Sequence, residues 1–494
     1  MRLKNLRTKE IAISALCIAA ISMIALIFSF AAKSQIFTPS NSLTDSSVFQ
    51  YVARVMLKGG VPYRDTFDHK GPLIYFINAF ALWLSPEKGL WIVELIVLVL
   101  SFVIMYRLSR LFCNKITSVF VVIAIVPILY QYFEGGNFTE EYALPLVAGA
   151  LYIFSDFFIN KKISRFRLLI CGASLGAVLM LRVNMIAVWI VMSLGVFALS
   201  IYNREYKRLF SFLGYFMLGL LIVVAPFIIW LAVHGALKDF WNSYIVFNFA
   251  YSSDAVRANI YSKAYSFLHF LYVPLVMVAG GVTCVSFFKK RNFLDVLYLI
   301  CLILTLLLTC ISGQFYGHYG MIIVPILIIP LAYIGKVCDN AFEKNQLLSI
   351  FIIIYLLVSS ALPTWQALTN NALVSFQNRG NEKIDSTVLA VSSWVEENTG
   401  EDERIIVCGN WNIIYNQSNR FAASKYSYQS PICEINSDMG SEFFEEISQN
   451  KPKAIILLKG FFAYDKMQQF IIKYNYVRVN VNDTGDNIEL YIAT

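Results

Sequence analysis

The most prominent feature of the chain is a series of apolar runs separated by short charged segments. A transmembrane helix needs about 20 mostly apolar residues, and eleven runs come near this length. We therefore predict a polytopic α-helical membrane domain with about eleven transmembrane helices. The runs are Ile11–Ala32, Leu90–Leu111, Ile116–Tyr132, Tyr142–Ile159, Leu168–Leu181, Met185–Tyr202, Leu209–Val233, Phe267–Phe288, Leu294–Cys310, Met321–Val337 and Leu347–Leu362.

The first run, Ile11–Ala32, follows a basic segment, as the apolar part of a signal peptide also does. A signal peptide, however, has an apolar stretch of only about 7–15 residues. Because this run is long enough to cross a bilayer, we expect it to remain as the first transmembrane helix.

One apolar segment, Pro72–Leu84, is too short to cross a membrane. At about 1.5 Å per residue it covers roughly 20 Å, whereas the hydrocarbon core is about 30 Å thick. If it lies in the outer interface, every short basic loop is cytoplasmic, as the positive-inside rule requires. We therefore expect a multi-pass protein of the bacterial cytoplasmic membrane with its N-terminus in the cytoplasm. The basic residues of these loops are Arg107, Arg110, Lys115, Lys161, Lys162, Arg165, Arg167, Arg204, Lys207, Arg208, Lys289, Lys290, Arg291, Lys336 and Lys344.

With this topology, residues 33–87 form one long external loop. Within it, Asp45–Lys58 has apolar residues at the spacing of a helix that lies on a surface, and two glycines end that helix. Pro72 then opens a second surface helix, because proline is tolerated in the first helical turn.

After Leu362 the composition changes, and polar and charged residues return. Short apolar strands alternate with helices, a pattern typical of a small α/β domain. We expect a transmembrane domain over residues 1–362 and an extracytoplasmic α/β domain over residues 363–494. The predicted strands are Ile405–Val407, Ala454–Leu458 and Ile488–Ile492, and the predicted helices are Ser386–Asn398 and Phe443–Gln449.

Composition supports a membrane protein and argues against two other classes. The chain is 58% hydrophobic and 15% charged, whereas soluble domains carry about 25% charged residues. The net charge of +8 is spread over loops, so it does not indicate nucleic-acid binding. The nine cysteines include no CxxC pair, so a zinc site is not indicated. Cys408 and Cys433 share the outer domain, where they either pair or remain free thiols.

Three outer loops carry polar chemistry. In the first, Asp45, Arg64, Asp68, His69 and Lys70 lie beside apolar helices, an arrangement that suits a substrate with a charged head and a hydrocarbon tail. Asp45 begins its helix, where it acts either as an N-cap or as a catalytic base. The alternative for the segment from Asp68 to Lys70 is a solvated turn.

The second loop joins two spans and contains Glu134, Glu140 and Glu141. Carboxylates at a membrane face are unfavourable unless they are solvated or paired, and a role in the site is the less favoured of two interpretations. The alternative is that Asn137 or Thr139 caps the next helix and the acids stabilise its first turn.

The third loop runs from Ser312 to Gly320 and contains Gln314, Tyr316, His318 and Tyr319. Glycines, aromatic rings and a histidine suit a cavity for sugar and phosphate. The alternative is an aromatic belt with an incidental histidine. Further outer-side charges are Arg182, Glu94 and Lys238.

The first loop contains the motifs Asp45-Ser46-Ser47-Val48-Phe49, Gly60-Val61-Pro62-Tyr63-Arg64-Asp65 and Asp68-His69-Lys70-Gly71-Pro72. These motifs resemble those of GT-C-type membrane glycosyltransferases, in particular the branch related to protein O-mannosyltransferases and the lipid A aminoarabinose transferase. The segment Gly317-His318-Tyr319 is similar to the late Pro-His-Tyr loop of that family, although glycine replaces the proline. Ser46 stands where many relatives have a second acid, and Gly71 stands where the first proline of a pair is usual. In the outer domain, Trp394, Arg404 to Gly409 and Ser424-Lys425-Tyr426 resemble the C-terminal domain of some members.

The resemblance implies an inverting transferase whose donor is a polyprenyl-phosphate sugar and whose acceptor is a lipid, glycan or protein on the outer face. Asp45 would be the general base. The departing phosphate would be stabilised by Lys70, His69, Arg64, His318 and Arg182. Fixed cations suffice for such a leaving group, so no cofactor is expected, and a divalent metal is left open. The remaining expected substrate contacts are Asp68, Glu140, Glu141, Gln314, Tyr316 and Tyr319.

Three other functions compete with this interpretation. A polysaccharide polymerase or ligase also acts on lipid-linked glycans, but it usually places its functional arginines and histidines in large later loops. A transporter is expected to have ionisable residues near span centres and some repeat symmetry, and the sequence has neither. A receptor that reads sugars with its C-terminal domain is the third alternative.

Overall fold

The computed structural model describes residues 2–39, 45–251, 273–311, 316–343, 347–379, 385–481 and 487–493. The chain divides into two compact units, each assembled from three segments. The helical unit comprises Met1–Gln35, Trp91–Phe227 and Ser252–Gln377. The mixed unit comprises Ile36–Leu90, Ile228–Tyr251 and Asn378–Thr494. The first external loop therefore folds together with the C-terminal segment.

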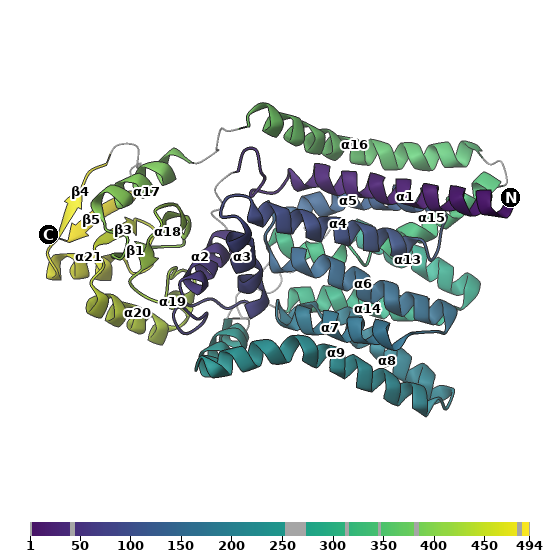
Figure 1. Cartoon of the computed structure of the whole chain (residues 1–494), viewed down its shortest axis with the longest axis horizontal. Helices are drawn as coiled ribbons and strands as arrows, with labels where there is room; N and C mark the ends of the chain where they lie inside the picture. The colour runs from purple at the N-terminus through teal and green to yellow at the C-terminus, as the bar shows by residue number, and fades with distance from the viewer. Residues whose placement is uncertain are drawn as a thin grey trace. The chain divides into compact units, whose positions relative to one another are not determined.

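The helical unit is a bundle of apolar helices (Figure 1). A helix lies at each of the eleven predicted runs; at the run from Met321 a 3₁₀ segment, η3 (Gly317–Ile323), precedes α15 at an angle of 52°. Of the described helices, six are long and apolar enough to span, or seven if η3 and α15 form one span. The helices are α1 (Arg2–Ser29), α4 (Gly89–Ser109), α5 (Lys115–Phe133), α6 (Thr139–Asn160), α7 (Arg165–Leu179), α8 (Ala187–Tyr202), α9 (Tyr206–Val233), α13 (Val273–Lys290), α14 (Phe293–Cys310), α15 (Ile328–Glu343) and α16 (Leu347–Gln377).

Glycines allow α7 and α9 to pack closely. A Cβ atom added to Gly172 of α7 would lie 1.9 Å from the carbonyl oxygen of Phe216 in α9. One added to Gly219 of α9 would lie 2.1 Å from the carbonyl oxygen of Leu169 in α7. Small residues that let backbones approach are the usual means of joining helices in lipid.

The mixed unit contains a five-stranded sheet in the order β2-β1-β3-β5-β4 (Figure 1). The strands β2, β1 and β3 are parallel, whereas β5 runs antiparallel to both β3 and β4. The strands are β1 (Arg404–Cys408), β2 (Phe421–Ala422), β3 (Ala454–Leu458), β4 (Tyr476–Val479) and β5 (Ile488–Ala493). The helices of its C-terminal segment are α17 (Ser386–Asn398), α18 (Ile413–Gln417), α19 (Ile432–Ile435), α20 (Ser437–Asn450) and α21 (Tyr464–Lys473).

The surface helices of the first loop belong to the same unit. They are α2 (Asp45–Leu57) and α3 (Pro72–Leu84), as the sequence predicted. The hydroxyl of Tyr51 in α2 accepts a hydrogen bond from the backbone N–H of Ala422, at 2.9 Å. The backbone N–H of Phe67 donates to the carbonyl of Lys425, at 2.8 Å. These bonds join segments about 360 residues apart.

The boundary expected at residues 362/363 lies inside α16, which continues to Gln377. The change in composition precedes the end of the helix, because polar residues can extend a helix beyond its apolar part. Cys408 and Cys433 are both buried free thiols in the structure.

Candidate functional site

The charged residues of the first loop form a cluster where α2 begins and just before α3. Asp45 is the first residue of α2, and Lys70 lies two positions before Pro72. The Lys70 Nζ atom lies 3.5 Å from Asp45 Oδ2 and 3.2 Å from His69 Nε2. The Lys70 side chain is 11% exposed, whereas that of Asp45 is 40% exposed. A nearly buried ammonium group is thus held beside a carboxylate that solvent can reach.

Asp68 supports this cluster from below the surface. Its carboxylate is 3% exposed and accepts hydrogen bonds from the hydroxyls of Tyr75 (2.8 Å) and Tyr428 (2.6 Å) and from the backbone N–H of His69 (2.8 Å). Burial raises the pKa of Asp68, while Lys70 and the hydrogen bonds oppose that shift. The alternative of a solvated turn is therefore wrong, because Asp68 is a buried, hydrogen-bonded scaffold residue.

His69 is held by its backbone and by neighbouring rings. Asn248 donates a hydrogen bond from Nδ2 to the His69 carbonyl at 2.7 Å. The ring of His69 lies 5.5 Å from that of Phe247 and 5.9 Å from that of Tyr251. Sequence reasoning missed Asn248 and Tyr428, and only the nearby Ser424-Lys425-Tyr426 motif could have pointed to the second of them.

Arg64 is engaged elsewhere in the mixed unit. Its Nε and Nη2 atoms donate to the carboxylate of Asp65, both at 2.8 Å, and its Nη1 atom donates to the carbonyl of His234 at 2.7 Å. The hydrogen bond from Arg64 lowers the pKa of Asp65. Arg64 is 44% exposed, and its role in phosphate binding stays a prediction.

A second cluster lies in the helical unit, where η3 meets the segment between α5 and α6. His318 is buried, with its Nδ1 atom 2.9 Å from Glu134 Oε2 and its ring stacked on Phe138 at 4.0 Å. The hydrogen bond with His318 lowers the pKa of Glu134. Glu134 and Phe138 therefore hold the His318 ring in place.

The same cluster contains an arginine that is paired with an acid. Arg182 forms an ion pair with Glu140, and its guanidinium lies 3.8 Å from the centre of the Tyr319 ring. Thr139 donates to the other oxygen of Glu140 at 2.8 Å. Tyr316 is 46% exposed and stacks beside His318, and Gln314 lies outside the described residues.

The alternative for the second loop was capping by Asn137 or Thr139. In the structure Phe138 occupies the N-cap of α6 and makes no side-chain capping bond, so that alternative is wrong. Glu140 and Glu141 do lie in the first turn, where the helix dipole favours acids.

Glu141 has a buried carboxyl neighbour, Glu94, which the sequence analysis named only as a further outer-side charge. Glu94 and Glu141 are fully buried and interact with each other. Ser34 donates to Glu94, and the backbone N–H of Asn137 donates to Glu141 at 2.7 Å. The sequence signal for this buried pair was Glu94, a glutamate placed within an apolar run.

The two clusters differ in their chemistry. The mixed-unit cluster (Asp45, Asp68, His69 and Lys70) combines a reachable carboxylate with a fixed cation. The helical-unit cluster (Glu134, Glu140, Arg182, His318 and Tyr319) combines a cation with acids and aromatic rings. Within the described ranges, no three His, Cys, Asp or Glu side chains are placed to hold a metal ion.

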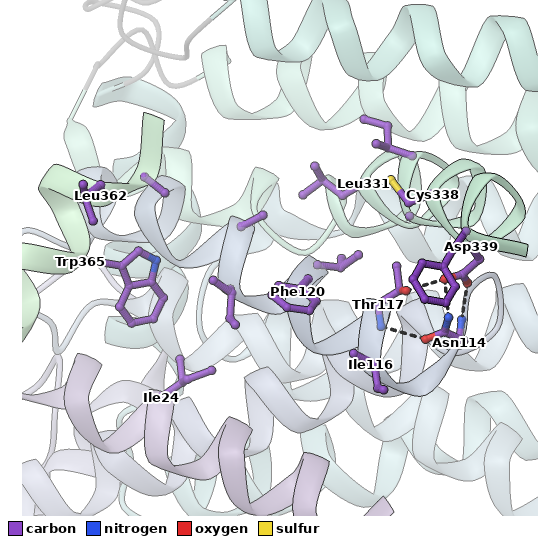
Figure 2. A pocket seen from close by; sticks show the side chains of 17 residues that line it. Ile24, Asn114, Ile116, Thr117, Phe120, Leu331, Cys338, Asp339, Leu362 and Trp365 are labelled. Atoms are coloured by element: carbon purple, nitrogen blue, oxygen red, sulfur yellow. Dashed lines mark hydrogen bonds between the residues drawn. The ribbon is translucent and has the colours of Figure 1, made fainter. Parts of the chain in front are cut away.

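A large cavity of about 610 Å³ lies in the helical unit between α1, α5, α15 and α16 (Figure 2). Its lining is mainly aliphatic and aromatic, with Ile24, Phe120 and Trp365 among the residues labelled in the figure. Asp339 at one end accepts hydrogen bonds from Asn114 and Thr117. Such a cavity suits a hydrocarbon chain, and the lining residues that the structure describes include no cation for a phosphate and no predicted site residue.

Comparisons with known proteins bear on the fold. Residues 6–346 match the family model described as "Putative competence-induced protein Ccs4 N-terminal domain". No curated protein matches the chain.

The structure is similar to the crystal structure of ArnT from Cupriavidus metallidurans bound to undecaprenyl phosphate, with a TM-score of 0.60, 12% identity and coverage of 97% of both chains. The apo state of ArnT from the same organism gives a TM-score of 0.57 at 11% identity and the same coverage. The fold is therefore that of GT-C membrane proteins such as ArnT, the lipid A aminoarabinose transferase.

Proposed function

Because the chain belongs to the Ccs4 N-terminal domain family and has the GT-C fold, we propose that it is an inverting glycosyltransferase. It moves a monosaccharide from a polyprenyl-phosphate carrier to a lipid, glycan or protein acceptor on the outer face of the cytoplasmic membrane. The ArnT structure that contains undecaprenyl phosphate supports this class of donor. The observation that carries the proposal is the pair formed by Asp45 and Lys70, 3.5 Å apart.

The pair supplies the two groups that such a transfer requires. The Asp45 carboxylate takes the proton of the acceptor hydroxyl as that oxygen attacks the anomeric carbon. The bond from this carbon to the carrier phosphate breaks, and its electron pair stays on the phosphate oxygen. Lys70 and His69 stabilise the negative charge that develops there. A single in-line attack inverts the anomeric centre.

The other predicted residues have supporting roles in this proposal. Asp68 positions His69 and Lys70, because its carboxylate is enclosed by hydrogen bonds and is not free to contact a substrate. His318 and Arg182 stay predicted phosphate contacts. The predicted contacts to the sugar and acceptor are Glu140, Glu141, Gln314, Tyr316 and Tyr319.

The test is to incubate purified protein in lipid nanodiscs with polyprenyl-phosphate sugars and an extract of envelope lipids and glycans. We expect release of free polyprenyl phosphate together with a product whose anomeric configuration is the inverse of the donor. A polymerase would give products with many added sugars. A transporter would move the donor across vesicle membranes while the sugar–phosphate bond stays intact.

A further inference from the structure

A second cavity, of about 250 Å³, lies in the helical unit where the loop between α6 and α7 meets the start of α9. Four of its lining residues are cationic and none is acidic. Its walls are apolar side chains, including Phe157 of α6 and Phe212 of α9. The four cations are Lys161, Lys162, Arg165 and Arg208. The charge pattern of the chain assigns this face to the cytoplasm.

Most of this positive charge is not balanced by the protein. Arg208 forms an ion pair with Glu205, and one of its nitrogens donates to the Lys161 carbonyl at 3.5 Å. Within the part of the chain that the structure describes, no carboxylate forms an ion pair with Lys161, Lys162 or Arg165. The Arg165 guanidinium instead lies 5.5 Å from the centre of the Tyr215 ring. About three positive charges thus surround a small cavity.

Two of the four cations also lie at a helix N-terminus, where positive charge is unfavourable, whereas Lys161 is the C-cap residue of α6. Arg165 is the first residue of α7, and Arg208 lies in the first turn of α9. Neither first turn contains an acid. A helix N-terminus carries partial positive charge, so it attracts anions and disfavours cations. A bound anion would relieve this unfavourable arrangement.

The surroundings indicate which anion. Bulky apolar side chains next to the cavity are exposed: Phe166 and Ile170 on α7, and Tyr206 and Phe210 on α9. Phe166 is 69% exposed and Phe210 is 71% exposed, as expected for side chains in contact with lipid. We infer that the cavity binds the phosphate headgroup of an anionic phospholipid, with the acyl chains lying along α7 and α9.

This site is independent of the proposed transfer reaction, because no candidate catalytic or substrate residue lines the cavity. Its role is to bind a lipid of the leaflet opposite the one that contains the sugar donor.

The test compares lipid binding by the full-length protein and two triple variants in detergent, measured by native mass spectrometry. The first replaces Lys161, Lys162 and Arg165 by glutamine. The second variant is a matched control with the same change to glutamine at Arg107, Arg204 and Lys207. These are exposed basic residues outside the cavity lining. Phosphatidylglycerol and phosphatidylcholine with the same acyl chains are the probes.

We expect the wild-type protein and the control variant to retain phosphatidylglycerol in preference to phosphatidylcholine. The cavity variant should lose about 100-fold in affinity for phosphatidylglycerol, which corresponds to about 5-fold per cation. If the cavity variant does not fold, Lys162→Gln alone should lose about 5-fold, because replacing an exposed lysine is not expected to disturb folding. The proposal is overturned if the wild type retains both lipids equally or if the cavity variant keeps its affinity for phosphatidylglycerol. It is also overturned if the control variant loses as much affinity as the cavity variant. Displacement of the lipid by glycerol phosphate at similar concentration would show a soluble phosphate site and would also overturn it.

Discussion

The replacement of Lys70 by methionine separates catalysis from stability. The side chain is 11% exposed and its ammonium group lies 3.5 Å from Asp45 Oδ2. Methionine has a similar length and fills the same space, but it removes the positive charge.

The expected effects on turnover and on stability differ in size. Removing one group that stabilises the developing charge in a transition state lowers turnover about 10²–10³-fold, or roughly 3–4 kcal/mol. The ion pair itself contributes little to folding, because Asp45 is 40% exposed and such pairs are worth less than about 1 kcal/mol. The variant should therefore fold normally and turn over slowly.

The assay measures release of polyprenyl phosphate in nanodiscs, with thermal unfolding followed by tryptophan fluorescence. Lys58→Met is the matched control, because Lys58 is an exposed lysine of the same loop. Lys70→Arg keeps the charge and should retain much of the activity. The reasoning is refuted if Lys70→Met turns over within about threefold of the wild type, or if Lys58→Met is equally impaired.

Three further predictions concern the supporting structure. Asp68→Ala leaves three hydrogen-bond donors without their acceptor, so chemical unfolding should show a loss of several kcal/mol in the mixed unit, at about 1–3 kcal/mol per donor. Asp68→Asn should lose less stability. Because burial raises the pKa of the folded Asp68 carboxyl, the stability of Asp68→Asn relative to the wild type should improve as the pH rises above about 4. Gly136→Ala should distort the loop before α6, because the backbone φ of Gly136 is +83° and the new Cβ would lie 2.3 Å from Glu94 Oε1. We expect faster proteolysis of this loop, and an unchanged proteolysis rate would contradict the prediction. His318 lowers the pKa of Glu134, so the ionised Glu134 stabilises the fold above pH 4.5 by less than about 1 kcal/mol, and this contribution is lost as the pH falls. Glu134→Gln should therefore abolish this part of the pH dependence of the free energy of unfolding.

The sequence predicted local elements well where glycine, proline or polar residues mark their ends. The helix Pro72–Leu84 has the predicted bounds, because Gly71-Pro72 opens it and Ser85-Pro86 follows it. The strand Ala454–Leu458 was likewise predicted, since its buried run is bounded by polar residues. Apolar periodicity and turn residues act over a few positions, and these elements need no more than that.

Long-range pairing had no such local signal. The sequence placed Asp68 in the first loop but could not show that Tyr428, 360 residues later, donates to it. It also could not show that Arg182 pairs with Glu140, because that contact depends on how α6 packs against the loop after α7. The first loop was predicted to be part of the transmembrane domain over residues 1–362, whereas its helices belong to the same compact unit as the C-terminal segment.

The most direct test of the central claim is the turnover of Asp45→Asn in reconstituted, folded protein with a polyprenyl-phosphate sugar. The account predicts a loss of about 10²–10⁴-fold with an unchanged unfolding temperature, as expected when a general base is removed. Glu87→Gln, which alters an exposed carboxylate of the same loop, should stay close to the wild-type rate. Full transferase activity in the Asp45→Asn protein would contradict the account.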